Sequence, residues 1–337
     1  RAQPSGGPDD CFMVFRPHMG EETRFYWNAS LGYAHNPLRK DAVTNSIDAR
    51  NGMEDVVRGQ FLLYPSAGIE IANRFGFNIM IPFVPYQFTG ADPASEGVGQ
   101  GGLAQHGSMG DVRIDGRVVV WRSDDRKTSL GATAAFTFPT GTETAFGGDR
   151  GPTALLLAAL EHDFGDFFIT GHVGPNFKPF GSIGGREGDL FIGNELRYAV
   201  SIFLPLRDDR LRLGAEHWGS TGMESVSGSS TFFNGRNTTL EWLAKARMLL
   251  DDSKRFYANF GGGTRLTGGY GSADFRLMAG LGMYWTFKDL EPESPPPKLQ
   301  IVSRPEHYDD DADKDGYPDA IDKCPGEAED GKPPEKS

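Results

Sequence analysis

The chain has 337 residues, of which 24% are charged and 12% aromatic, with 45 glycines and a formal net charge of -12. The acidic balance argues against a nucleic-acid partner, because there is no basic patch that could release counterions from phosphate. No segment reaches the roughly 18 unbroken apolar residues of a membrane helix, so none is expected. The composition is compatible with a membrane β-barrel, since only every second residue of its strands meets lipid.

About 12 segments of the chain alternate apolar and polar residues. In one of them Val112 and Ile114 fall on one side of the strand and Arg113 and Asp115 on the other, because successive side chains point to opposite faces. Long Gly-rich loops and tight polar turns alternate between the segments. We therefore predict an all-β fold, an antiparallel up-and-down transmembrane β-barrel of about 12 strands over residues 24–288.

The predicted strands also indicate how the barrel is oriented. They lie near residues 24–34, 57–71, 75–88, 111–121, 128–139, 152–164, 167–178, 190–202, 211–220, 240–248, 255–267 and 272–287. Outer-membrane barrels place short turns in the periplasm and long loops outside. The first strand leads into a long loop, so both termini are expected to be periplasmic, including an N-terminal segment of residues 1–23. The predicted location is the bacterial outer membrane, in contact with its lipid.

The inward faces of the predicted strands carry as many basic as acidic side chains. These are Arg58, Glu70, Asp111, Arg113, Asp115, Arg117, Glu161, Glu195, Arg197, Arg212, Glu216, Glu241, Lys245, Arg247, Asp274 and Arg276. A buried charge is costly unless it is paired, so the balanced set predicts an ion-pair network that narrows or plugs the lumen. A selective pore would show an excess of one sign at a constriction, and an open diffusion channel remains the alternative.

The last predicted strand ends in Gly282, Trp285 and Phe287, in the order Gly-x-x-aromatic-x-aromatic. This order resembles the terminal signal that the outer-membrane barrel assembly machinery recognises, which implies that machinery as a partner during biogenesis. An aromatic girdle at the membrane interface explains the same residues. The two interpretations are compatible, because one concerns the chemistry of the residues and the other their position.

The composition changes after the predicted barrel. Residues 289–308 contain five prolines, which favour extended polyproline II and predict a semi-rigid linker. Residues 309–337 follow as an acidic segment. Calcium takes about six to eight oxygen ligands, and carboxylates at alternate positions of a loop that contains a glycine can supply them. We therefore predict a Ca²⁺ site here, and the alternative is an acidic solvated tail that binds no ion.

The run from Asp311 to Pro325 resembles a thrombospondin type-3 repeat, with Gly316 at its sixth position and Asp322, where an EF-hand has Glu, at its twelfth. In bacterial envelope proteins such repeats commonly lie between an outer-membrane barrel and a peptidoglycan-binding OmpA-like domain. The resemblance implies which groups bind the Ca²⁺ ion. They are the side chains of Asp311, Asp313, Asp315 and Asp322, the backbone carbonyl of Tyr317, and Asp319 directly or through water.

Three short motifs of the barrel are similar to barrels of the OmpA family: GDVRIDGR at 110–117, FTFPTGT at 136–142 and FGGD at 146–149. The predicted function is therefore an OmpA-like envelope anchor or scaffold with a calcium-stabilised periplasmic extension. Its partner would be peptidoglycan or a periplasmic or envelope protein complex. The alternative is an outer-membrane porin or channel for small solutes.

The remaining candidates for chemistry are one histidine and serine pair and the two cysteines. His217 and Ser220 share a strand, but residues three apart point to opposite faces and cannot form a nucleophile and base pair, so no enzyme activity is expected. Cys11 and Cys324 flank the barrel and are both expected in the periplasm, where disulfides persist. They either pair with each other, or Cys324 pairs beyond residue 337, as successive type-3 repeats usually do. Sequence alone does not establish the connectivity.

Overall fold

The computed structural model describes residues 3–41, 53–89, 106–141, 147–183, 190–226, 229–287 and 310–327. The chain divides into two compact units, Arg1–Leu290 and Glu291–Ser337. Within the described ranges no helix is long and apolar enough to cross a membrane. The predicted linker, residues 289–308, lies outside the described residues.

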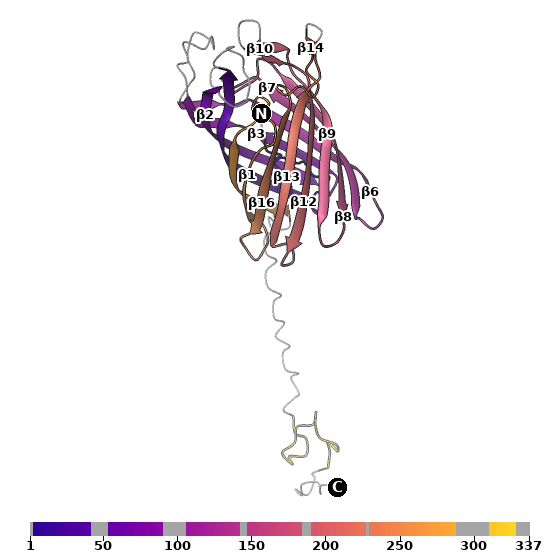
Figure 1. The fold of residues 1–337 in the computed structure, drawn as a ribbon. Helices are drawn as coiled ribbons and strands as arrows, with labels where there is room; N and C mark the ends of the chain where they lie inside the picture. The colour runs from indigo at the N-terminus through magenta and orange to yellow at the C-terminus, as the bar shows by residue number, and fades with distance from the viewer. Residues whose placement is uncertain are drawn as a thin grey trace. The chain divides into compact units, whose positions relative to one another are not determined.

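The first unit is an antiparallel sheet that closes into a barrel (Figure 1). Its strands are β1 (Arg24–Asp41), β2 (Met53–Ile71), β3 (Phe75–Met80), β4 (Phe83–Thr89), β5 (His106–Met109), β6 (Val112–Arg122), β7 (Thr128–Phe138), β8 (Thr153–Asp163), β9 (Phe168–Phe177), β12 (Glu195–Leu206), β13 (Leu211–Gly222), β16 (Thr239–Leu249), β17 (Phe256–Arg265) and β18 (Phe275–Thr286). Strand β1 pairs with β2 on one side and with β18 on the other, which closes the sheet.

Two spans of the barrel are each broken into two strands, so the 14 strands described in this sheet make 12 spans. The predicted 12-stranded barrel is therefore confirmed. Strands β3 and β4 both pair with β2 and are separated by Ile81 and Pro82, because a proline has no N–H to donate to the ladder. Beside this break, between β5 and β6, the N–H of Gly110 donates to the carbonyl of Pro82 at 2.7 Å.

Small two-stranded sheets lie in the long connections at the other end from the tight turns (Figure 1). One pairs β10 (Gly181–Ile183) with β11 (Leu190–Ile192), and the other pairs β14 (Ser225–Val226) with β15 (Ser229–Ser230). The barrel therefore has a short-turn end and a long-loop end.

Burial follows the predicted alternation of inward and outward side chains. In β6 the Arg113 side chain is 1% exposed, whereas Ile114 is 45% exposed. The outward side chains form an apolar and aromatic surface, as a barrel surrounded by lipid requires. Arg58 is an exception, because it was expected inward and is exposed. The pairing of β2 with β4 shifts register between Val57 and Gly59, and this irregularity turns the Arg58 side chain outward.

Gly282 in β18 lies directly opposite Tyr257 in β17. The Tyr257 ring is fully buried and lies across the glycine, so that a methyl group added at Gly282 would overlap the ring. Gly282 therefore has a packing role in the last strand pair, whatever its role in the predicted assembly signal.

We predict that Gly282→Ala lowers the free energy of unfolding of the barrel by about 1–3 kcal/mol, because the ring and the added methyl group cannot occupy one space. Thermal unfolding of the purified protein in detergent measures this. Gly116→Ala is the matched control, since the atom nearest to its added carbon is a ring carbon of Phe77 at 3.8 Å, an ordinary contact. Equal unfolding temperatures for the two variants would contradict the packing role.

Candidate functional site: a lumen filled by the N-terminal segment

Residues 3–20, here called the luminal segment, lie inside the barrel, whereas Glu21 and Glu22 are exposed. The side chain of Val14 is completely buried, and those of Phe12, Phe15 and Met19 are nearly so. The first described residue, Gln3, lines a small cavity with wall residues from β6 to β12. The expectation that residues 1–23 form a separate periplasmic segment is therefore corrected for residues 3–20.

An uninterrupted apolar run explains this position. Residues 11–15 read Cys-Phe-Met-Val-Phe, and in water they would expose a large apolar surface. Phe12 and Met13 pack with Leu243 and Met278 of the wall. Cys11 and Val14 pack with Phe168, Ala199 and Phe203. Phe15 packs with Ala135, Leu155 and Leu157.

The backbone of the luminal segment is bound by wall side chains. Glu216 of β13 accepts hydrogen bonds from the N–H of Phe12 at 2.7 Å and from the N–H of Met13 at 2.8 Å. The Nδ1 atom of His172 accepts the N–H of Phe15 at 3.3 Å. A buried backbone N–H without a partner is costly. These wall side chains supply the hydrogen-bond acceptors that a neighbouring strand of a sheet would otherwise provide.

Ion pairs connect the segment to the wall as well. Arg16 donates two hydrogen bonds of 2.7 Å to the Glu161 carboxylate, and both side chains are buried. Arg117 donates to Asp10 at 2.9 Å. The predicted ion-pair network is also present within the wall, for example between Arg276 and Glu241 at 3.0 Å. The luminal segment, which the sequence analysis placed outside the barrel, completes that network.

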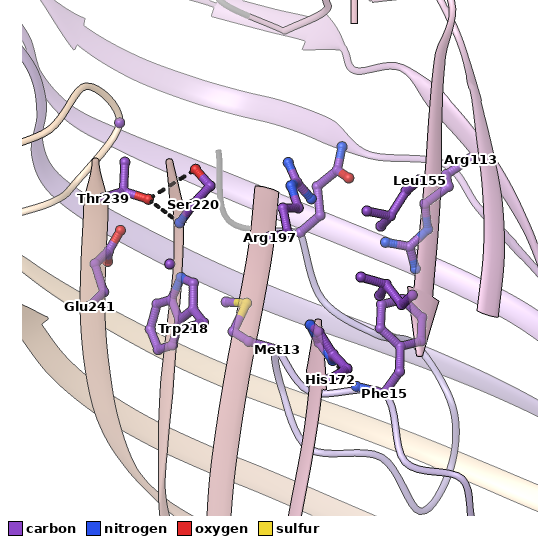
Figure 2. Close-up of a pocket in the computed structure, with 14 residues that line it drawn as sticks. Met13, Phe15, Arg113, Leu155, His172, Arg197, Trp218, Ser220, Thr239 and Glu241 are labelled. Atoms are coloured by element: carbon purple, nitrogen blue, oxygen red, sulfur yellow. Dashed lines mark hydrogen bonds between the residues drawn. The ribbon is translucent and has the colours of Figure 1, made fainter. Parts of the chain in front are cut away.

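Besides the small cavity at Gln3, two larger cavities lie between the described residues of the lumen. One of about 50 Å³ lies beside the segment, where Met13 and Phe15 face His172, Arg197 and Trp218 (Figure 2). The other, of about 150 Å³, has a mainly apolar lining that also includes two basic residues and the acidic Asp149. Its lining includes Ala34, Leu38, Val57, Leu62, Ile192, Lys178 and Arg276. Both are small beside the roughly 300–1,000 Å³ of an ordinary ligand pocket, so the segment occupies much of the space between the walls.

In the second unit, the structure describes residues 310–327. The carboxylates of Asp311, Asp313 and Asp315 offer ligand atoms within 4.8 Å of one another. Gly316 has a φ of 97°, which suits glycine, and its N–H donates to Asp311 at 3.0 Å. Asp322 is outside this group of three, although the sequence analysis assigned it the twelfth position.

The other predicted ligands lie in the same loop. Asp319 accepts the N–H of Ala312 at 2.8 Å, and the N–H of Tyr317 donates to Asp315 at 2.9 Å. One carboxylate oxygen each of Asp313 and Asp322 is buried and has no hydrogen-bond partner. Desolvation, together with the charges of Asp315 and Asp322, raises the pKa of Asp313 above its ordinary value. The oxygen set therefore fits a hard cation such as calcium.

Both cysteines are free thiols. Cys11 is buried in the lumen with its Sγ atom 3.2 Å from Oγ of Ser201, and Cys324 is exposed in the second unit.

No family model and no curated protein matches the chain. Among solved structures it is similar to an outer membrane channel from Pseudomonas putida F1, at 13% identity over 80% of this chain and 97% of that one, with a TM-score of 0.56. Weaker matches are the NanC porin (8% identity, 77% and 98% of the chains, TM-score 0.45) and the toluene transporter TbuX from Ralstonia pickettii (11%, 80% and 90%, 0.35). At such low identity the first match shows the fold alone, that of an outer-membrane β-barrel.

We predict that Arg16→Ala exposes Cys11 to a maleimide reagent in a Cys324→Ser background. Leaving Glu161 buried and unpaired costs about 3–5 kcal/mol, and about 1.4 kcal/mol already changes an equilibrium tenfold. The labelling rate should therefore rise more than about tenfold. Arg210→Ala is the control, because Arg210 pairs with Asp252 at an exposed turn. Equal labelling of the two variants would show that Arg16 does not hold the segment in place.

Proposed function

We propose that this protein is a channel of the bacterial outer membrane for small solutes, and that the luminal segment closes it. The observation that carries the proposal is that the lumen is filled by a segment of chain and not by wall side chains alone. A segment of chain fills the lumen through hydrogen bonds, ion pairs and apolar contacts with the wall. Such a segment can move while the sheet stays intact, whereas a lumen filled by wall side chains alone could open only if the sheet itself changed.

The sequence motifs favour an envelope anchor over a channel, and we now reverse that order. An anchor has no need of a movable closure. The similarity to a solved outer membrane channel, of which 97% is covered, supports the same choice at the level of the fold. On this proposal the outward apolar surface contacts membrane lipid, the short turns face the periplasm, and the barrel assembly machinery inserts the chain.

We predict that deleting residues 5–19 converts a nearly closed barrel into one with a larger, steady conductance in planar bilayers, because the deletion removes the material between the walls. The native chain should show small or rare openings. Circular dichroism of the deleted protein serves as the control for an intact sheet. A folded deletion variant without conductance, or a native chain that is already widely open, would each contradict the proposal.

We also propose that residues 310–327 bind Ca²⁺, as a second property of the chain. The support is the convergence of Asp311, Asp313 and Asp315, together with the buried carboxylate oxygens of Asp313 and Asp322 that lack a partner. A bound cation would supply that partner and offset the repulsion among the carboxylates. The ordered extension would then reach a periplasmic partner, such as peptidoglycan or an envelope protein complex.

Calorimetry on the full chain should give a calcium affinity of about 10⁻⁴ to 10⁻³ M, the range of extracellular modules. Asp315→Ala should abolish the heat, and Asp252→Ala, at an exposed turn of the barrel, should leave it unchanged. Calcium binds the ionised carboxylate, so lowering the pH toward the raised pKa of Asp313 should weaken binding. Equal heats from both variants would mean that the segment is an acidic tail without a specific Ca²⁺ site.

A further inference from the structure

Four arginines of the wall meet two neighbouring aspartates of the luminal segment at the short-turn end. The arginines come from four different strands and are Arg24 of β1, Arg117 of β6, Arg212 of β13 and Arg247 of β16. All four side chains are buried or nearly so. The two aspartates, Asp9 and Asp10, differ in what they contact.

Asp10 serves the fold of the segment itself. Besides Arg117, its carboxylate accepts the backbone N–H of Gly7 at 3.0 Å and that of Arg16 at 3.0 Å. These bonds close a turn around residues 7–16. A change at Asp10 would therefore disturb the segment as well as its contact with the wall.

Asp9 faces the wall. Its carboxylate pairs with Arg24, lies 3.3 Å from Nη2 of Arg247, and lies 3.6 Å from Nη1 of Arg212. Among the described residues, no backbone N–H donates to that carboxylate. Three guanidinium groups from three strands thus surround one carboxylate, which is the arrangement by which arginines recognise a carboxylate or phosphate ligand.

The charges balance only when the segment is in place. The wall offers these arginines two acids, Glu70 and Asp209. Asp9 and Asp10 bring the acids to four, which equals the number of arginines. Within the described part of the chain, the ion pair of Arg247 is the one with Asp9, and its Nε atom has no hydrogen-bond partner. Withdrawal of the segment would remove two acids from these arginines and would also remove Arg16 from Glu161, which leaves the wall with a net excess of one positive charge. Buried charges without partners are costly.

We propose that the four arginines form an anion site of the lumen, that Asp9 occupies the site while the channel is closed, and that the transported solutes carry a carboxylate or phosphate group that takes the place of Asp9. The inference rests on the proposed channel function and adds the charge of the solute. Asp9 acts as an internal competitor. An anion at the site supplies the missing partner of the arginines and so stabilises the state in which the segment has moved.

The test uses the full chain with Asp9→Asn, which keeps the shape of the side chain and removes its charge. Inorganic phosphate should raise the unfolding temperature of this variant by about 2–4 °C relative to chloride at equal ionic strength, since a bound ligand stabilises the folded state. The native chain should respond less, because Asp9 competes. Glu21→Gln is the matched control, since Glu21 is 76% exposed and pairs with the exposed Arg126. It should behave as the native chain does.

Bilayer recordings in a potassium chloride gradient give the second measurement. Openings of Asp9→Asn should be anion-selective, phosphate should reduce their chloride current, and Asp9→Asn combined with Arg247→Gln should lose much of both effects. Openings of the native chain should also favour anions, and this test does not depend on the folding of any variant. Cation-selective openings, or an equal response of all variants to phosphate, would overturn the anion site and leave the channel in place. Stabilisation by phosphate without conductance in any protein would keep the site and overturn the channel.

Discussion

The buried charges of the inner wall need partners, and the rest of this structure depends on how they find them. In lipid every backbone polar group must be satisfied within the sheet, so the sheet closes on itself. Closure turns the polar side of each strand toward a confined interior. Some of the charges there pair along the wall, as Arg276 does with Glu241. Others, such as Glu161 and Arg247, are paired by residues that precede the first strand.

The strands were predictable because lipid on one side and charge on the other produce an alternation that each strand carries in its own residues. Arg113 and Ile114 of β6 fall on the expected faces for this reason. Arg58 does not, because its direction depends on a register shift against another strand, β4. Alternation within one segment contains no information about such a shift. The same limit applies to every feature that arises between segments.

The two candidate sites illustrate that limit. The acidic loop of the tail closes within a dozen or so residues, so the spacing of Asp311, Asp313 and Asp315 is enough to bring their carboxylates together. The lumen joins residues that are far apart in the chain, such as Phe12 and Glu216. Equal numbers of inward acids and bases indicated a filled interior but could not show which partner each charge takes. The apolar run at 11–15, set between two aspartates and an arginine, was the signal that could have placed the segment inside.

The contact of Asp9 with three strands also constrains how this barrel can change over generations. Arg24, Arg212 and Arg247 lie far apart in the sequence, yet each lies within 4 Å of the same carboxylate. A substitution at any one of them alters the environment of the other two, so single steps tend to be harmful and compensated combinations are favoured. We therefore expect the wall and the segment to change together, and a segment taken from a different barrel to meet arginines that it does not match.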